Sequence, residues 1–175
     1  MTAQGWRELH LREAVRFSAG SYLSARDYGG GPIVVEGAGG EMGRTGAPNI
    51  SLPITVIGRV GTVGRPRYYP EGCWVNNNAA ALVANDGFNP LFVFYAVSLL
   101  DFTRFTLATA QPYLSVEDLM GSTILAPDLD EQTAVAEALS VADEQIAALT
   151  AQRDKAKLVK LGMMQELLSG KRRLV

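Results

Sequence analysis

The chain has 175 residues, of which 47% are hydrophobic, enough for one good core, and this composition excludes a disordered or collagen-like chain. The net charge of −2 argues against a protein that binds nucleic acid through its overall charge. Charges, Gly and Pro interrupt the apolar residues before any run reaches the roughly 20 residues that span a bilayer. We therefore expect a cytoplasmic protein without a membrane partner.

Residues 1–127 and 128–175 differ in pattern, with the boundary at Pro127. In the first region, breaks rich in Gly and Pro separate short runs of β-forming residues, which is typical of many short strands and turns. The second region has an almost uninterrupted helical pattern. We predict an α+β fold, with a mixed, β-rich domain over 1–127 and a long C-terminal helical region of coiled-coil type over 128–175. The β-type runs include Pro32–Glu36, Leu52–Gly58 and Cys73–Val75.

A buried helix is predicted within the first region. Asn89 can cap it, Pro90 suits its first turn, and residues 91–100 carry Phe, Tyr and Val on several faces, which implies deep burial. We expect a shorter helix to begin at Ser115, because the spacing to Asp118 matches a weak capping box.

The segment Gly58–Gly64 follows a predicted strand and has the glycine spacing G-x-x-G-x-x-G. A phosphate-binding loop would need a Lys-Ser or Lys-Thr pair, which is missing, and a dinucleotide-binding fold would need a helix, which Pro66 and Pro70 prevent. We therefore predict a turn or hairpin. Residues 42–70 contain four arginines and no acidic residue, so this part of the chain offers local positive charge despite the acidic total.

Arginine can fork onto phosphates or guanine edges, tyrosine can stack on bases or sugars, and asparagine amides pair with adenine. These chemistries make the arginine-rich segment, with the asparagines after Trp74, a candidate for reading double-stranded DNA. The alternatives are an ordinary solvated turn for the arginine segment and turn formation for the asparagines. The candidate DNA-binding residues are Arg44, Arg59, Arg65, Arg67, Tyr68, Asn76 and Asn77.

The C-terminal region begins with acidic residues at Asp128–Glu131 and ends in Lys171–Arg173, as the helix dipole favours. One long helix and a short helix followed by a long one, beginning near Ser140, both fit the pattern. Apolar or small residues recur mostly three or four positions apart and form one stripe. An alternative is packing of this stripe on its own domain, but its length favours pairing with another helix or another chain. The stripe residues are Leu139, Ala142, Ile146, Leu149, Ala156, Val159, Met163 and Leu167.

No catalytic or metal-binding pattern is found in the sequence. Cys73 is the only cysteine and is expected in the core, and His10 is the only histidine and is expected at the surface or in packing. The segment Asn89–Phe92 resembles the N-P-P-Y/F loop of DNA amino-methyltransferases, but Leu91 replaces the second Pro and no S-adenosylmethionine loop accompanies it. We predict a protein that is not an enzyme and holds no metal or cofactor.

Over nearly its whole length the chain resembles the specificity subunits of type I restriction-modification systems. Ile57–Gly64, followed by Trp74 and the asparagines, is similar to the family's I-G-R-x-G-x-x-G, W and N. Ala110–Leu114 and Ile124–Pro127 match its Q-x-x-L and I-x-x-P elements. The helical region matches E-Q at Glu131–Gln132, L-x-x-x-D-x-x-I at Leu139–Ile146 and M-Q-x-L-L-x-G-K-x-R at Met164–Arg173.

The resemblance implies a half-length specificity subunit, complete at both ends, with one target-recognition domain and one helical spacer where family members usually carry two of each. Two copies would pair through antiparallel spacers into a homodimer that reads an inverted repeat with a gap. Methyltransferase subunits would be its partners, with a restriction subunit as a further candidate, and S-adenosylmethionine would bind only in the partner subunit. One alternative is a helical assembly protein that docks on methyltransferase subunits without reading DNA. Another is a self-sufficient methyltransferase, for which the cofactor loop is missing.

Overall fold

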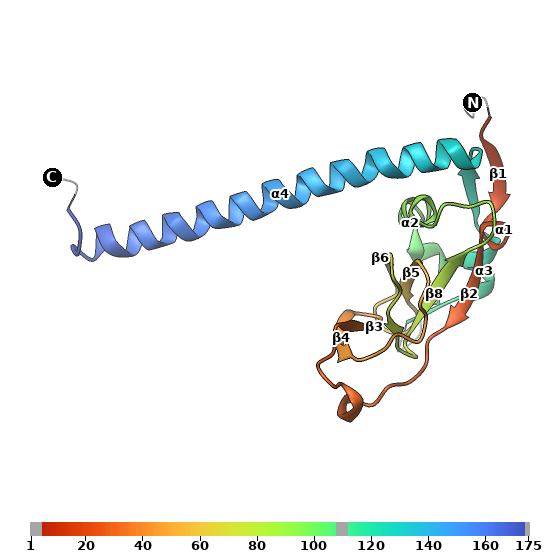
Figure 1. Cartoon of the computed structure of the whole chain (residues 1–175), viewed down its shortest axis with the longest axis horizontal. Coiled ribbons are helices and arrows are strands. Elements are labelled where there is room, and N and C mark those ends of the chain that lie inside the picture. The colour runs from red at the N-terminus through yellow and green to blue at the C-terminus, as the bar shows by residue number, and fades with distance from the viewer. Residues whose placement is uncertain (1–4, 108–111, 174–175) are drawn as a thin grey trace. The chain divides into compact units, whose positions relative to one another are not determined.

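The computed structural model describes residues 5–107 and 112–173. The chain divides into two compact units, Met1–Ala136 and Glu137–Val175. Strands and short helices make up most of the first unit, and one long helix makes up most of the second (Figure 1). This α+β architecture confirms the predicted fold class. Ala110 and Gln111 of the predicted Q-x-x-L element lie outside the described residues.

An antiparallel sheet of four strands forms the centre of the first unit. Its strands are β2 (Val15–Ala19), β5 (Ile54–Gly58), β6 (Gly64–Tyr69) and β8 (Ala79–Ala84). They follow the order β2-β8-β5-β6, so β6 lies at one edge. Every residue of β5 is buried, because this strand has a neighbour on both sides and carries the β-branched residues that fit a covered sheet.

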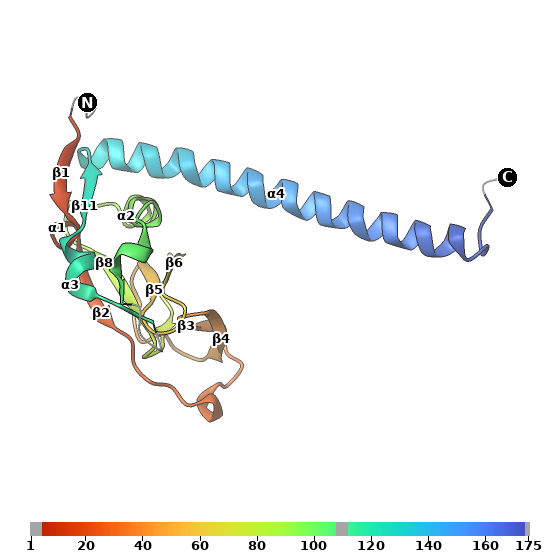
Figure 2. The ribbon, with the colours of Figure 1, turned by 180° about the vertical axis from the view of Figure 1, so that it is seen from behind.

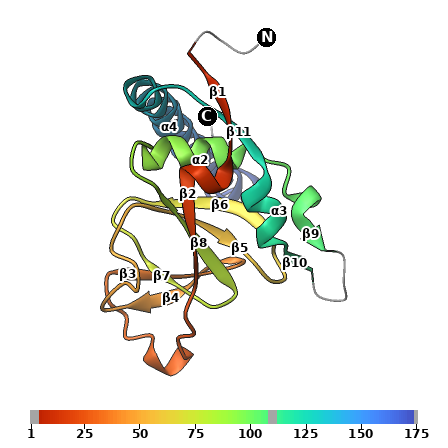
Figure 3. The same ribbon diagram turned by 90° about the vertical axis from the view of Figure 1, so that its right-hand side faces the viewer.

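A second sheet of three strands packs on one face of the first. It consists of β3 (Ile33–Gly37) and β4 (Gly40–Thr45), which form a hairpin, and β7 (Trp74–Val75), which runs parallel to β3. The two sheets lie one on the other (Figure 3), and apolar side chains of both form a small core. The buried members of this core are Ile54, Val56, Cys73, Val75, Ala79, Ala81 and Val83.

Helix α2 (Pro90–Ser98) covers the other face of the four-stranded sheet (Figure 3). Asn89 caps this helix, since its side-chain oxygen accepts hydrogen bonds from the N–H groups of Leu91 and Phe92, both 3.0 Å long. The cap confirms the prediction and accounts for the Asn-Pro segment without any catalytic role. The core beneath α2 includes Ile57, Leu82, Phe92, Val93 and Val97.

Short elements complete the first unit. β1 (Arg7–His10) pairs antiparallel with β11 (Thr123–Ala126), close to helices α1 (Leu11–Ala14) and α3 (Val116–Gly121) (Figure 2). Ser115 caps α3 as predicted, because its hydroxyl accepts a hydrogen bond of 3.4 Å from the N–H of Asp118. The remaining elements are η1 (Ala25–Asp27), η2 (Phe102–Phe105) and the strand pair β9 (Thr106–Leu107) and β10 (Tyr113–Leu114).

Helix α4 (Leu129–Leu168) is a single helix of 40 residues, which corresponds to about 60 Å at 1.5 Å per residue (Figure 1). Of the two arrangements that fit the sequence pattern, one rod is therefore the one adopted, without a break near Ser140. Within the described residues, no helix combines the length and the hydropathy needed to cross a membrane.

The first two turns of α4 belong to the first compact unit. Gln132 is buried there, where its Nε2 donates to the carbonyl of Pro127 (3.0 Å) and its Oε1 accepts from the N–H of Asn89 (2.9 Å). The Nε1 of Trp6 donates to the carboxylate of Glu131 over 2.9 Å. Glu131 and Gln132 both lie in the first compact unit, which reaches Ala136, and the domain boundary at Pro127 stays a prediction.

Candidate nucleic-acid interface

Three loops that are far apart in the sequence meet in space. They are the turn 37–40 between β3 and β4, the loop 58–64 between β5 and β6, and the turn 76–78 between β7 and β8. The N–H of Ala38 donates to Oδ1 of Asn78 (3.2 Å), and the N–H of Arg59 donates to the carbonyl of Asn78 (2.9 Å). We call these three segments the loop cluster.

Glycine is required where these loops approach most closely. A Cβ on Gly58 would lie 1.9 Å from the carbonyl oxygen of Thr62 and 2.8 Å from that of Ala38, distances that real Cβ atoms do not reach. Gly64 has a φ of +80°, and a Cβ there would lie 2.8 Å from the ring of Phe102. The glycine spacing therefore builds the tight β5–β6 hairpin that the sequence predicted, rather than a phosphate-binding loop.

Arg59 and Asn77 are the predicted residues that the loop cluster brings to the surface. The Arg59 guanidinium lies 5.6 Å from the centroid of the Phe17 ring, within the range of a cation–π interaction, and its side chain is half-buried. Asn77 is exposed. Asn76, by contrast, is buried with 3% exposure, and its backbone N–H donates to the carbonyl of Glu36 over 2.8 Å.

Arg65 stands at the start of β6 with an exposed side chain. Its φ is +54°, and among residues 5–107 and 112–173 it is the one non-glycine residue with a positive φ. A non-glycine residue in the left-handed region costs about 1–3 kcal/mol, and such strain concentrates at functional sites. Together with the left-handed Gly64 before it, this conformation sets the direction in which the Arg65 side chain leaves the hairpin.

Arg67 is paired with a buried carboxylate. Its Nη1 donates to Oε1 of Glu36, and the hydroxyl of Tyr69 donates to Oε2 of the same side chain over 2.6 Å. Glu36 is fully buried, whereas the Arg67 side chain is 28% exposed. The Nη2 of Arg67 lies beside Gly40, where a Cβ would be 3.7 Å away. Arg67 therefore reaches from the interior of the domain toward the loop cluster.

Burial determines the titration of this region. The pKa of Glu36 lies above its ordinary value because burial disfavours the carboxylate, although the hydrogen bond from Tyr69 and the charge of Arg67 oppose that effect. Burial likewise raises the pKa of the Cys73 thiol to about 12, with a smaller contribution from Glu36. A buried, protonated thiol is not a nucleophile, so Cys73 is a core residue, as predicted.

Two predicted DNA-binding residues lie away from the loop cluster. Arg44 is exposed at the far end of the β3–β4 hairpin, where it forms an ion pair with Glu41 (3.0 Å) and donates to the carbonyl of Pro32 (3.1 Å). Tyr68 faces α2, and its ring centroid lies 5.8 Å from that of Phe94. Neighbouring residues of a strand point to opposite faces of the sheet, so the Tyr68 side chain lies on the α2 face and the Arg67 side chain on the other face.

Sequence reasoning missed Glu36, and it missed the structural role of Asn78. The sequence contained one signal for Glu36, which is a charged residue at the end of an otherwise apolar β-type run. A charged residue is almost never fully buried unless it is paired, so this position indicated a partner. Asn78 differs from the two asparagines before it because its side chain and carbonyl tie two other loops together, which the sequence pattern cannot distinguish. Within the part of the chain that the structure describes, no three His, Cys, Asp or Glu side chains gather closely enough to hold a metal ion.

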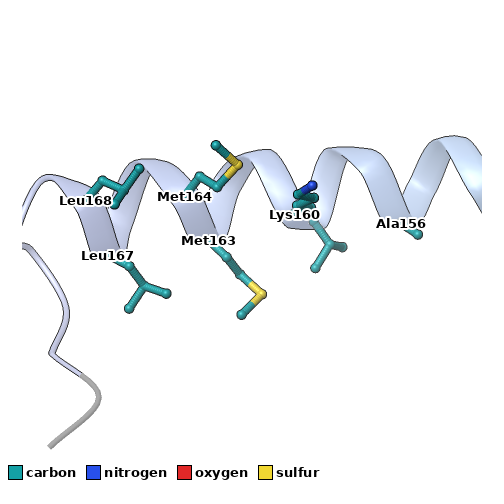
Figure 4. Close-up of a pocket in the computed structure, with 7 residues that line it drawn as sticks. Ala156, Lys160, Met163, Met164, Leu167 and Leu168 are labelled. Atoms are coloured by element: carbon teal, nitrogen blue, oxygen red, sulfur yellow. The ribbon is translucent and has the colours of Figure 1, made fainter.

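The predicted stripe on α4 is exposed along most of its length. Ile146 is 61% exposed, Leu149 is 64% and Met163 is 54%. Toward the C-terminal end of α4, Met163 and Leu167 point to the same side of the helix and line a shallow apolar depression with Ala156 (Figure 4). An apolar stripe this exposed is typical of a helix that pairs with another helix.

The family model that matches this chain describes the type I restriction modification DNA specificity domain, and the match covers residues 5–158. The chain belongs to this family. The match includes the loop cluster, β6 and most of α4. No curated protein sequence matches the chain.

Solved structures with the same fold come from type I restriction-modification systems. The S subunit from M. genitalium has a TM-score of 0.75 at 19% identity, over 94% of this chain and 46% of that chain. A structure described as showing complex assembly and conformational transition of the type I R-M system has a TM-score of 0.72 at 21% identity, over 95% and 46%. The HsdS subunit from Thermoanaerobacter tengcongensis has a TM-score of 0.66 at 19% identity, over 95% and 45%. The chain thus spans less than half the length of these solved chains.

Proposed function

We propose that the chain is a DNA-reading specificity subunit that catalyses no reaction itself and directs methyltransferase subunits to a bipartite site. The observation that carries this proposal is the family match over residues 5–158, which includes both the domain and most of α4. The arginines of the loop cluster and of β6 support it, because reading bases needs local rather than overall positive charge. Arg59, Arg65, Arg67 and Asn77 are the base-reading residues that the surface positions favour.

The partner of α4 in this proposal is a second copy of the same chain. The chain spans 46% of the length of the S subunit from M. genitalium, so two copies supply the length of one such subunit. The exposed stripe supplies the apolar surface for a helix pair, and a two-fold axis makes the same stripe serve both copies.

Charge along residues 128–173, which include α4, favours an antiparallel pair. Residues 128–151 carry six acidic residues and no basic one, whereas residues 152–173 carry seven basic and two acidic residues. An antiparallel arrangement places the acidic half of one copy against the basic half of the other, and a parallel arrangement places like charges together. The acidic residues of the first half are Asp128, Asp130, Glu131, Glu137, Asp143 and Glu144.

The stripe also supports one register for this pair. With the two-fold axis near Ala151, Leu139 lies opposite Met163 of the second copy and Ile146 lies opposite Ala156. In these two layers an apolar side chain of one copy meets an apolar side chain of the other, as at a coiled-coil seam, whereas Leu149 lies opposite Arg153. In the same register Asp143 lies near Lys157 of the second copy, with opposite charge.

Methyl transfer and cleavage are assigned to other subunits. S-adenosylmethionine would bind in the methyltransferase partner, and a restriction subunit would complete the complex. The solved structure described above as showing complex assembly of the type I R-M system has the fold of this chain, which supports an assembly of this kind.

The proposal is tested by co-expressing the chain with the methyltransferase subunits of its system and measuring the mass of the purified complex. We expect two copies of this chain per complex and selection of one bipartite motif from a randomised double-stranded DNA library. A stable complex that selects no motif would favour the alternative of an assembly protein that does not read DNA. The acidic net charge of the chain supports that alternative. A complex with a single copy of this chain would contradict the homodimer.

A further inference from the structure

Glu36 is a carboxylate that the fold buries completely at the end of β3, although β3 lies beside a surface loop. Both of its oxygens are occupied, one by Arg67 and one by the hydroxyl of Tyr69. The Arg67 side chain is 28% exposed and lies on the edge strand β6, beside Gly40 of the loop cluster. The geometry thus joins a fixed, buried anion to an arginine that reaches the candidate interface.

Stability does not account for this pair. Removing a carboxylate and a guanidinium from water costs free energy that the attraction between them often fails to offset, and apolar replacements of buried ion pairs are commonly tolerated. The raised pKa of Glu36 points the same way, because it means that burial outweighs the favourable contacts with Tyr69 and Arg67. A role at the candidate interface offers an explanation for a charge at this buried position.

We propose that Glu36 is a positioning residue, which fixes the plane of the Arg67 guanidinium so that its Nη2 side is presented to a guanine in DNA. This inference rests on the proposed function of the chain. A guanidinium has five N–H donors in a rigid fork, and Glu36 takes a bond from Nη1. Guanine offers two acceptors, O6 and N7, in the major groove, and two parallel bonds to them need a fixed donor plane.

Gly40 lies beside Nη2 of the guanidinium, whereas the bond to Glu36 is made by Nη1. A Cβ at this position would lie 3.7 Å from Nη2 and 4.0 Å from Cζ of Arg67, so a larger side chain would cover the donors. Gly40 has a φ of +130°, which also disfavours other residues. The same turn therefore leaves the Arg67 fork uncovered and keeps larger residues away from it.

The inference is tested by selecting bound sequences from a randomised double-stranded DNA library with the full chain in complex with its methyltransferase subunits. Glu36→Met, Arg67→Lys and the double variant are compared with the wild type. Glu36→Met removes the anchor, and Arg67→Lys keeps a cation for Glu36 but loses the fork. We expect each single variant to lower the preference for guanine at one and the same position, by about five- to a hundredfold, and the double variant to lose no more than Arg67→Lys.

Tyr69→Phe is the matched control, because it removes the other hydrogen bond of Glu36 without touching the guanidinium. It is expected to shift the melting temperature and to leave the base preference unchanged. Glu36→Gln keeps an acceptor for Arg67 and should cause an intermediate loss, so it serves as the second variant if Glu36→Met does not fold.

Three results would overturn the positioning role while leaving DNA reading intact. They are an unchanged preference in the Glu36 variants, an equal loss in Tyr69→Phe, and a weaker affinity for all sequences with a smaller salt dependence, which would indicate a phosphate contact. A wild-type complex that selects no motif would contradict the proposed function itself, together with this inference.

Discussion

Arg65 and Glu36 show how single residues at the candidate interface depart from what their local structure favours. Arg65 has a left-handed backbone that glycine would adopt at no cost, and Glu36 is a charge in the interior. Both residues adjoin the loop cluster. The sequence indicated that the arginines mattered, but backbone conformation and burial depend on contacts between loops that are distant along the chain.

Arg65→Gly should weaken DNA binding without destabilising the domain. Glycine keeps the positive φ, so the substitution removes the side chain and leaves the hairpin intact. We expect binding by the assembled complex to weaken by about 1–3 kcal/mol if Arg65 contacts a base, or its salt slope to fall by about one if it contacts a phosphate. Fluorescence anisotropy at several salt concentrations measures both. Unchanged affinity and salt slope would remove Arg65 from the interface.

The stability of the Glu36→Gln variant should depend on pH relative to the wild type. The pKa of Glu36 is raised in the folded protein above its ordinary value of 4.5, so the folded state binds this proton more tightly than the unfolded state. The unfavourable contribution of Glu36 to the stability of the fold is therefore absent below pH 4.5, and it appears as the pH rises through the raised pKa. Denaturant titrations should show Glu36→Gln gaining stability relative to the wild type over this window. A difference that is constant, or that moves in favour of the wild type, would contradict the assignment.

Among the elements, α4 has two parts with different surroundings. Its first two turns are fixed to the domain through Glu131 and Gln132, and its remaining turns are exposed. The length of the helix and its stripe were predictable from spacing, because an exposed helix has few contacts that override the local pattern. The interior position of Gln132 was not predictable, since it depends on a bond to Asn89, which lies 43 residues earlier.

Gln132→Leu should destabilise the domain by at least about 2 kcal/mol. Leucine fits a helix, but it would leave the carbonyl of the buried Pro127 and the N–H of the half-buried Asn89 without this partner, and each such loss costs about 1–3 kcal/mol. The free energy of unfolding from urea titration measures the effect. Gln152→Leu, at an exposed position of the same helix, is the control and should change stability by less than about 0.5 kcal/mol. Equal effects of the two substitutions would argue against a special role for Gln132.

Charge reversal on α4 should weaken self-association, and a second reversal should restore it. In the register proposed above, Lys157→Glu places two like charges together at each of two symmetric positions. We expect the dissociation constant of the homodimer to rise by about three- to thirtyfold, from about 0.3–1 kcal/mol per pair. Adding Asp143→Lys to the same chain should bring the constant back toward that of the wild type. Analytical ultracentrifugation distinguishes this result from further weakening, which would exclude the register.

At the scale of the whole molecule, the sequence predicted the fold class, the hairpin after Gly58, the cap at Asn89 and the long helix. These features depend on local signals, namely glycine spacing, capping residues and apolar periodicity. It did not predict the parallel pairing of β3 with β7 or the antiparallel pairing of β1 with β11, because pairing between distant short strands leaves little local signal. The same holds for the candidate interface. Its arginines were predictable from the sequence, whereas the residues that contact them were not.

The central claim is that two copies of this chain read one site through a two-fold axis. Mapping methylated bases in the genomic DNA of the source organism, with and without the gene for this chain, tests that claim most directly. We expect methylation that depends on this chain to fall in a bipartite inverted repeat, with identical half-sites on either side of a gap of constant length. Methylation of an asymmetric sequence, or methylation that does not change when the gene is removed, would contradict it.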